Sequence, residues 1–320
     1  MTDYPKVSVV TITYGHEHFI TQTLDGVFMQ DYPGEIEFII ANDNSPDATD
    51  RVIRDYLAVK IIPTNFTIKY TVHEVNKGGV SNFSWALEQA SGKYVALCEG
   101  DDYWTDPLKL QKQVNFLERN SEYSLCFTAK SNIDNEGVFV GEAKYGYKEI
   151  WSKEDVLDGG FIAGLQTIVS KNLSKEFNEY CNHFPQRTGA DRLYTYFYGI
   201  KGKLKYLDEN MSVYRIHDGG MWSTLSEREK LMGHIKQHTI FLKKIAKNRQ
   251  HYKQLEKNMF RLIITKMYFK FFTTPAETSR RLVFVLIKYR QSPQVFFLAA
   301  EDFVKYYYKI IRSKVRRSKI

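Results

Sequence analysis

The residues best suited to chemistry form a short acidic run, Glu99, Asp101 and Asp102, interrupted only by Gly100. The run follows residues 94–98, whose apolar composition is typical of a buried strand. Carboxylate oxygens are preferred ligands of Mg²⁺ and Mn²⁺, and proteins usually share such ions with substrate phosphates. The alternative is a solvated acidic loop before the helix expected from Pro107. The sequence therefore predicts a candidate Mg²⁺ or Mn²⁺ site at the end of a strand.

Polar turns also follow the three preceding strand-like runs, 7–13, 36–41 and 68–72. In chain order these turns read Tyr14-Gly15-His16, Asn42-Asp43-Asn44-Ser45 and Asn76-Lys77-Gly78-Gly79. Ligands of parallel α/β sheets bind beyond the carboxyl ends of the strands. We therefore expect these turns to meet the acidic run at one edge of a sheet.

The elements that must position these turns alternate along the first hundred residues. Apolar residues recur at helical spacing in 18–30, 46–57 and 81–90, between the four strand-like runs. Such alternation predicts an α/β fold with a mostly parallel sheet that is covered on both faces. The middle third is mixed: we expect helices over 107–119 and 190–199, and strands over 125–129, 164–170 and 203–207.

Length and composition narrow the class of protein. A chain of 320 residues that is 43% hydrophobic and 26% charged is long enough to bury a core. The three cysteines, Cys98, Cys126 and Cys181, are too few and too widely spaced for a disulfide framework or a CxxC metal site. No signal peptide and no apolar run long enough to span a membrane is visible. These features predict a cytoplasmic protein.

The charge distribution singles out the C-terminal end. The net charge is +8, and seven basic residues with no acidic residue lie within 305–320. The rest of the chain is nearly neutral, which argues against a nucleic-acid-binding face on the main domain and leaves a nucleic-acid arm open for the tail alone. With Tyr306, Tyr307 and Tyr308, the tail is suited to an anionic membrane surface, or else it is a solvated helix end. After Ser226, apolar residues recur at helical spacing among many lysines. We therefore expect a catalytic domain over 1–222 and a helical C-terminal region over 223–320.

Several segments together resemble the family 2 glycosyltransferases. They are VSVVTITY (7–14), NDNSPDATD (42–50), NKGGVSNFSWALEQASGKYVALCEGDDYW (76–104) and GADRLYTYFYGIKGKLKYLDENMSVYRIHDGGMWS (189–223). The resemblance implies the GT-A fold, a nucleotide-binding α/β domain with a D-x-D-type metal motif. It also implies metal-dependent, inverting transfer of a hexosyl or N-acetylhexosaminyl group from a nucleotide-sugar, by default a UDP-sugar. The acceptor would be a hydroxyl of a glycan or lipid-linked acceptor in cell-envelope polysaccharide or lipopolysaccharide synthesis.

The resemblance also implies roles on the nucleotide side of the site. Thr13, Tyr14 and Glu17 would line the nucleoside pocket, and Asp43 would accept a hydrogen bond from the base. Asn76 and Gly78 would lie near the nucleotide, because glycine lets the backbone approach closely. Glu99 would contact the ribose. Asn42 stands where the family usually has a first acidic residue.

On the reaction side, Asp101 would bind the metal that bridges the diphosphate, and Asp102 would face the donor sugar or support the metal. Asp191 matches the catalytic base, and its alternative role is to cap the helix expected over 192–199. His217 would be a further metal ligand or a contact of the diphosphate. Arg215 would pair with an acid or with phosphate. We interpret His16 and His18 as loop residues.

Two other functions remain open on the sequence. A sugar-phosphate nucleotidyltransferase would need a glycine-rich, basic loop after the first strand, which Tyr14-Gly15-His16-Glu17 does not supply. A non-catalytic sugar-nucleotide-binding protein would need neither the acidic run nor Asp191. Metal-dependent turnover of a sugar nucleotide distinguishes these possibilities.

Overall fold

The computed structural model describes residues 4–144, 148–157, 163–182, 190–220, 225–226 and 229. The chain divides into two compact units, 1–224 and 225–320, and the fold described here is that of the first. The helices expected after Ser226 and the basic tail lie outside the described residues. No helix among the described residues has the length and apolarity that crossing a membrane requires.

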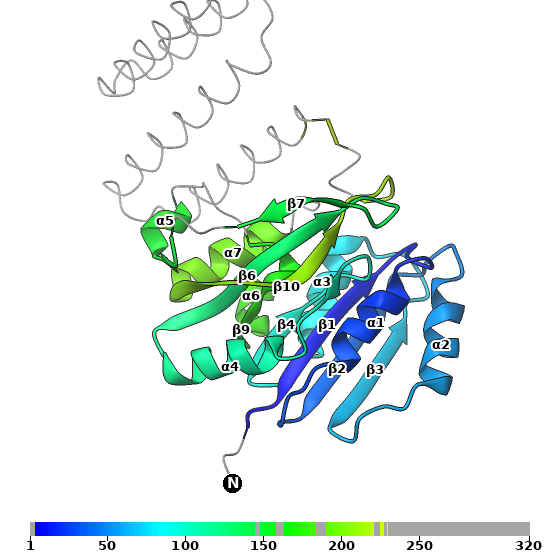
Figure 1. Ribbon diagram of the computed structural model, residues 1–320, viewed down its shortest axis with the longest axis horizontal. Helices are drawn as coiled ribbons and strands as arrows, with labels where there is room; N and C mark the ends of the chain where they lie inside the picture. The colour runs from blue at the N-terminus through cyan, green and yellow to red at the C-terminus, as the bar shows by residue number, and fades with distance from the viewer. Residues whose placement is uncertain are drawn as a thin grey trace, which may run out of the picture. The chain divides into compact units, whose positions relative to one another are not determined.

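The centre of the fold is a ten-stranded sheet with the order β3-β2-β1-β4-β9-β6-β10-β5, to which β7 adds on β6 and β8 on β10 (Figure 1). Its N-terminal part consists of β1 (Val7–Thr13), β2 (Ile36–Asn42), β3 (Phe66–Val72) and β4 (Tyr94–Leu97), all parallel. The expected α/β fold with a mostly parallel central sheet is confirmed. Antiparallel strands described below extend it.

Three helices connect these strands: α1 (Ile20–Phe28), α2 (Thr49–Val59) and α3 (Gly79–Glu88). The apolar residues Ile20, Leu24 and Val27 of α1 are fully buried, as their helical spacing predicts. Right-handed crossovers with this strand order place α1 and α2 on one face and α3 on the other (Figure 1). All seven residues of β2 are therefore buried.

The second part of the sheet is mixed. Its elements are β5 (Tyr103–Trp104), α4 (Lys109–Arg119), β6 (Tyr123–Ile133), β7 (Phe139–Ala143), β8 (Ile150–Trp151), α5 (Lys153–Leu157), a 3₁₀ turn η1 (Leu165–Thr167), β9 (Val169–Lys171), α6 (Ser174–Cys181), α7 (Ala190–Lys201) and β10 (Lys203–Arg215). Strand β10 runs parallel to β6 along the length of both strands. It is longer than the expected strand 203–207, and its far end carries Arg215 to the acidic run.

The expected strand 164–170 is wrong in its first half, where η1 stands in its place. The carbonyl of Gln166 accepts the indole N–H of Trp104 at 2.9 Å, and the Thr167 carbonyl accepts the Gln113 side-chain amide at 3.0 Å. These buried hydrogen bonds to distant side chains replace the strand-to-strand backbone hydrogen bonds of a sheet. Apolar composition alone does not distinguish such a turn from a strand.

Candidate functional site

The polar turns meet where the parallel strands end, as the sequence predicts. Thr13 at the end of β1 pairs with Asn42 at the end of β2. The amide of Gly100 in the acidic turn donates to the carbonyl of Ile12 at 2.9 Å. A Cβ on Gly100 would lie 2.7 Å from the Thr13 hydroxyl and 2.9 Å from His16 Nδ1. Only glycine therefore lets the acidic turn lie against the end of β1.

Three side chains from these turns form a cluster suited to a metal ion: His16, Asp101 and His217. One ligand atom from each lies within 4.8 Å of the others. His217 Nε2 is 3.1 Å and His16 Nε2 is 3.8 Å from the same Asp101 oxygen, Oδ2. Two imidazoles and one carboxylate are a ligand set used by first-row transition metals. The residues present therefore fit the divalent ion that the acidic run predicts.

Neighbouring groups orient both imidazoles. The Thr13 hydroxyl lies 3.2 Å from His16 Nδ1, which leaves Nε2 facing Asp101. The Phe19 ring packs against both imidazoles, with centroid distances of 6.4 Å to His16 and 4.8 Å to His217. Gly15 adopts a φ of +74°, so the chain turns sharply and returns His16 to the site.

The electrostatics suit metal binding at this cluster. Burial lowers the pKa of His16, so its imidazole is neutral and free to ligate. Burial raises the pKa of Asp101, but the His217 hydrogen bond and the charges of His16 and His217 outweigh this effect and lower it. The Asp101 carboxylate is therefore ionised beside the two imidazoles.

The other two acids of the run lie in different surroundings. Asp102 is only 1% exposed, and its Oδ1 accepts the backbone N–H of Arg215 at 2.9 Å. Burial and the charges of Asp101 and Glu99 raise the pKa of Asp102 well above its usual range. Burial, together with Asp101 and Asp191, raises the pKa of Glu99 to about 8. Asp102 thus fastens β10 to the acidic turn.

Arg215 braces the same turn. Its Nε donates to the Asp101 carbonyl at 3.2 Å, its Nη2 donates to Gln22 Oε1, and its guanidinium lies 4.6 Å from the centre of the Phe19 ring. The sequence predicted an acid or a phosphate as its partner. In the structure its side chain contacts a backbone carbonyl and a neutral amide and holds the main chain of Asp101, and a phosphate partner stays a prediction.

Asp43, expected to contact the base, organises the neighbouring loop. Its two oxygens accept the backbone N–H groups of Lys77 and Gly78 at 2.7 and 2.9 Å, and only 2% of Asp43 is exposed. Asn76 Oδ1 accepts the same Gly78 N–H at 2.9 Å. Gly78 has a φ of +82°, which explains the need for glycine.

Glu17 and Tyr14 lie on the turn after β1. Glu17 accepts the backbone N–H of Ala48 at 2.8 Å, and its own N–H donates to Asp47 at 3.1 Å. This reciprocal pair joins the turn to the start of α2. Tyr14 is 48% exposed and free to stack on a ligand.

Asp191 lies inside the first turn of α7, which begins at Ala190. The helix expected over 192–199 thus begins two residues earlier, and the base role and the capping role of Asp191 both stay predictions. Its Oδ1 accepts the backbone N–H of Arg192 at 2.7 Å. The charge of Asp191 contributes to the raised pKa of Glu99, which indicates that α7 brings this carboxylate near the acidic turn.

The sequence reasoning missed two site residues. His16 was interpreted only as a loop residue, although its position directly after a strand end could have indicated a ligand. Lys130, on β6, is close enough to Glu99, Asp102 and Asp191 for their charges to raise its pKa against the effect of burial. No local pattern marks Lys130, because the pairing of β6 with β9 and β10 brings it to these acids.

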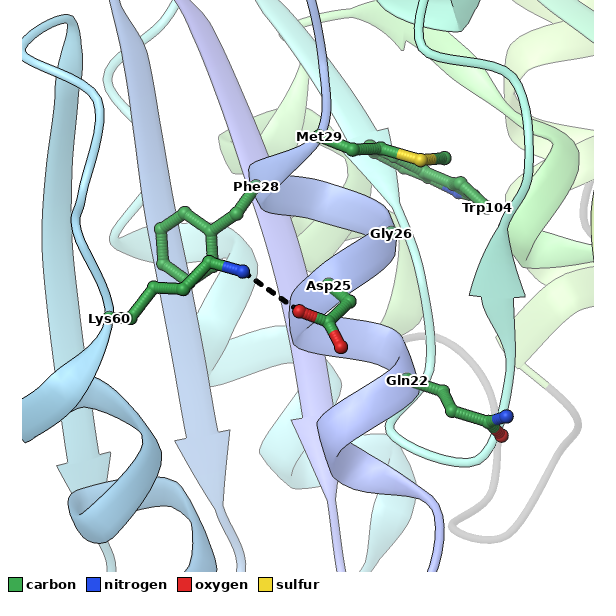
Figure 2. A pocket seen from close by; sticks show the side chains of 7 residues that line it. All are labelled: Gln22, Asp25, Gly26, Phe28, Met29, Lys60 and Trp104. Atoms are coloured by element: carbon green, nitrogen blue, oxygen red, sulfur yellow. Dashed lines mark hydrogen bonds and ion pairs between the residues drawn. The ribbon is translucent and has the colours of Figure 1, made fainter.

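A pocket on the outer side of α1 lies apart from this cluster. Figure 2 shows that it is lined by Gln22, Asp25, Gly26, Phe28, Met29, Lys60 and Trp104. Lys60 and Asp25 form an ion pair of 2.9 Å within it. None of the predicted site residues lines this pocket, so we do not assign it to the reaction.

Comparison with known proteins identifies the family. The model of glycosyl transferase family 2 matches residues 8–172. Protein Rv1520 of Mycobacterium tuberculosis is 35% identical over 227 residues, which cover 70% of this chain and 63% of that protein. The chain thus matches less than two-thirds of that relative. The Escherichia coli UDP-Glc:alpha-D-GlcNAc-diphosphoundecaprenol beta-1,3-glucosyltransferase WfgD is 28% identical over 153 residues, covering 47% of this chain and 56% of WfgD.

Solved structures share the fold. TarS of S. aureus (residues 1–349) in complex with UDP-GlcNAc aligns with a TM-score of 0.64 at 19% identity, over 84% of this chain and 76% of that one. The mannosyltransferase PcManGT from Pyrobaculum calidifontis, in complex with GDP-Man and Mn2+, aligns with a TM-score of 0.57 at 16% identity, over 93% and 87% of the two chains. The expected GT-A fold is confirmed.

Proposed function

We propose that this chain, which belongs to glycosyl transferase family 2, is a glycosyltransferase that uses a divalent metal and inverts the anomeric centre. The donor is a UDP-linked hexose or N-acetylhexosamine. The acceptor is a hydroxyl of a glycan or of a lipid-linked saccharide. WfgD, which by its name uses UDP-Glc and a diphosphoundecaprenol-linked sugar, supports both assignments.

The observation that carries this proposal is the His16–Asp101–His217 cluster at the carboxyl ends of the strands. These three residues would hold the ion, and their two imidazole nitrogens favour Mn²⁺ over Mg²⁺. A bound divalent cation neutralises the charge that develops on the leaving diphosphate. Mn2+ in the complex of the structurally similar PcManGT supports this choice.

The nucleoside side of the site follows from the turns around Asp43. Thr13, Tyr14 and Glu17 would border the nucleoside, and the exposed Tyr14 ring offers a stacking surface for the base. Asn76 and Gly78 would approach the nucleotide through a loop that Asp43 holds in place. The second lone pair on each Asp43 oxygen remains able to accept a hydrogen bond from the base. Glu99 would contact the ribose.

Asp191 would act as the general base. It takes the proton of the acceptor hydroxyl while that oxygen forms a bond to the anomeric carbon. The bond between this carbon and the diphosphate oxygen breaks on the opposite side, and UDP leaves. Attack from the face opposite the leaving group gives inversion. Asp102 would support the site indirectly, by joining β10 to the acidic turn.

The product class would be a cell-envelope polysaccharide or a lipopolysaccharide. Such acceptors are lipid-linked, so the enzyme would work at the cytoplasmic face of a membrane. The basic tail 305–320 would hold it there through anionic lipids.

The test compares the wild-type protein with Asp101→Ala in UDP calorimetry, with and without Mn²⁺, and in UDP release from UDP-glucose and UDP-GlcNAc. Asp55→Ala, which removes an exposed acid of α2, is the matched control. We expect Asp101→Ala to abolish both turnover and the effect of Mn²⁺ on UDP affinity. Unchanged Mn²⁺-dependent binding would refute the metal role. Binding without any turnover by the wild type would instead favour a non-catalytic sugar-nucleotide-binding protein.

A further inference from the structure

Lys130, on β6, is a cation among the carboxylates of the candidate site. Burial lowers its pKa, and the charges of Asp102, Asp191 and Glu99 oppose that effect. Its Nζ lies 3.9 Å from the centre of the Tyr214 ring of β10. An aromatic face at this distance attracts an ammonium group and fixes its position. The lysine is therefore held beside the acids rather than extended into solvent.

The ammonium group has unused hydrogen-bonding capacity. Among the described residues, no acceptor forms a hydrogen bond with Lys130 Nζ, and no carboxylate lies within the 4.0 Å of an ion pair. An ammonium carries three donors, whereas an aromatic face satisfies only part of its charge. Lys130 is partly buried, so leaving these donors without an acceptor carries a cost.

A second polar group at the same place also lacks a partner. Gln166 is 1% exposed, and its Nε2 has no hydrogen-bond partner among the described residues. A Cβ on Gly164 would lie 3.0 Å from Lys130 Nζ and 2.8 Å from Gln166 Oε1, so the two side chains converge at this glycine. Asp102 Oδ2, whose charge acts on Lys130, is likewise buried without a partner within the described part of the chain.

We propose that Lys130 is a substrate-binding residue that donates a hydrogen bond to a hydroxyl of the transferred sugar. The inference rests on the proposed function, because it needs a donor whose diphosphate lies at Asp101 and whose anomeric carbon faces Asp191. The sugar ring must then lie beside the acidic turn, where Asp102 holds the backbone of Arg215 and the adjacent Tyr214 holds Lys130. A sugar hydroxyl both accepts and donates, which matches a site that offers donors and acceptors together.

The surrounding charges also select the kind of sugar. The proposed function places the sugar between Asp101 and Asp191, and the guanidinium of Arg215 is already engaged by Asp101 and Gln22. A carboxylate on the sugar would lie between Asp101 and the proposed base Asp191, with the Lys130 ammonium as its one counter-charge. Like charges at close range disfavour binding. We therefore expect a neutral sugar, such as glucose or N-acetylglucosamine, rather than a uronic acid.

The test measures the affinities of UDP, UDP-glucose, UDP-GlcNAc and UDP-glucuronate in the presence of Mn²⁺, for the wild type and for Lys130→Met. UDP release with water as acceptor is measured alongside. Methionine has an unbranched side chain of similar length to that of lysine, but it carries no charge. We expect Lys130→Met to bind UDP like the wild type, which also shows that it is folded. Its kcat/KM for the preferred neutral UDP-sugar should fall about 10- to 100-fold, the usual effect of losing a charged hydrogen bond.

Lys203→Met is the matched control. Lys203 also lies over a tyrosine ring, 5.7 Å from the centre of Tyr123, but at the opposite end of β10 from Arg215. Its replacement should change none of these values. Equal weakening of UDP and UDP-sugar by Lys130→Met would show a phosphate contact and refute the proposal, as would an unchanged kcat/KM.

A wild-type preference for UDP-glucuronate would refute the neutral-sugar assignment. Absence of any sugar-nucleotide turnover by the wild type would count against the proposed function itself. An active wild type with an equally active Lys130→Met would overturn only the role of Lys130.

Discussion

Lys109 of α4 is fully buried behind the acidic turn, and we predict that it makes stability depend on pH. Its Nζ donates to Gln113 Oε1 and to the Thr167 carbonyl, and it lies 4.8 Å from the centre of the Trp104 ring. No carboxylate within the described residues forms an ion pair with it at 4.0 Å or less. Burial therefore lowers its pKa from 10.5 to about 7 in the folded state.

The direction and size of the effect follow from proton counting. Between about pH 7 and pH 10.5 the unfolded chain carries a proton on Lys109 that the folded chain has lost, so the free energy of unfolding rises with pH. The slope is at most about 1.4 kcal/mol per pH unit, which gives about 2 kcal/mol between about pH 7.5 and pH 9. Below about pH 7, Lys109 carries its proton in both the folded and the unfolded chain. The free energy of unfolding then no longer depends on pH through this residue.

Urea unfolding of the wild type and of Lys109→Met over this pH range measures the difference between the two slopes. The comparison cancels other titrating groups, including the buried cysteines. Lys112→Met on the same helix is the control, because Lys112 is only partly buried and is paired with Asp106 and Glu209. Removing it should leave the slope unchanged. Equal slopes for the wild type and Lys109→Met would refute the reasoning that Lys109 is buried without a compensating charge.

Three further predictions concern the reaction and the membrane. Asp191→Asn keeps the size of the side chain and an oxygen that can accept the Arg192 N–H, so nucleotide binding should persist. Turnover at saturating substrates should fall about 10²- to 10⁴-fold, because asparagine cannot act as a general base. Near-wild-type turnover would remove Asp191 from the mechanism. His16→Ala should weaken Mn²⁺ binding, measured by the electron paramagnetic resonance signal of free Mn²⁺, more than His18→Ala, because only His16 faces Asp101; equal affinities would contradict the three-ligand site. Deleting residues 305–320 should reduce co-sedimentation with phosphatidylserine vesicles, since each basic residue contributes up to about 1 kcal/mol at low salt; equal sedimentation would rule out a tail anchor.

The N-terminal half of the fold could be predicted from the sequence because its signals are local. The runs 7–13 and 36–41 are rich in apolar and β-branched residues, as expected of strands buried on both faces, and both form strands close to those bounds. The helix expected over 18–30 forms as Ile20–Phe28. Fraying of two residues at each end is within ordinary variation of helix boundaries.

The second half was less predictable because tertiary contacts decide its structure. Strand β10 extends to Arg215 through residues 208–210, which are exposed and polar, since pairing with β6 continues across two irregularities. A prediction from the alternation of apolar and polar residues ends this strand at Leu207. The 3₁₀ turn η1 likewise depends on Trp104, Lys109 and Gln113, three residues more than fifty positions away.

The same distinction separates the site residues. Asp101, Asp43 and Gly78 could be predicted because each stands directly after a strand, or in a glycine turn beside one. His217 needed the family resemblance, since it comes 116 residues after Asp101, to which its Nε2 is hydrogen bonded. Lys130 lies in the interior of β6, and nothing in the neighbouring sequence marks it as a site residue. It is recognised only from the fold, in which its ammonium group lies over the ring of Tyr214 from β10.

Strand β10 is the element that turns a nucleotide-binding edge into a complete site. The backbone N–H of Arg215 is fixed by Asp102, and its side chain is fixed by the Asp101 carbonyl. Two residues later His217 reaches the Asp101 carboxylate, and one residue earlier Tyr214 supports Lys130. The metal ligands and the proposed sugar contact are therefore set by one rigid segment, so disturbing the Asp102–Arg215 link should impair both together.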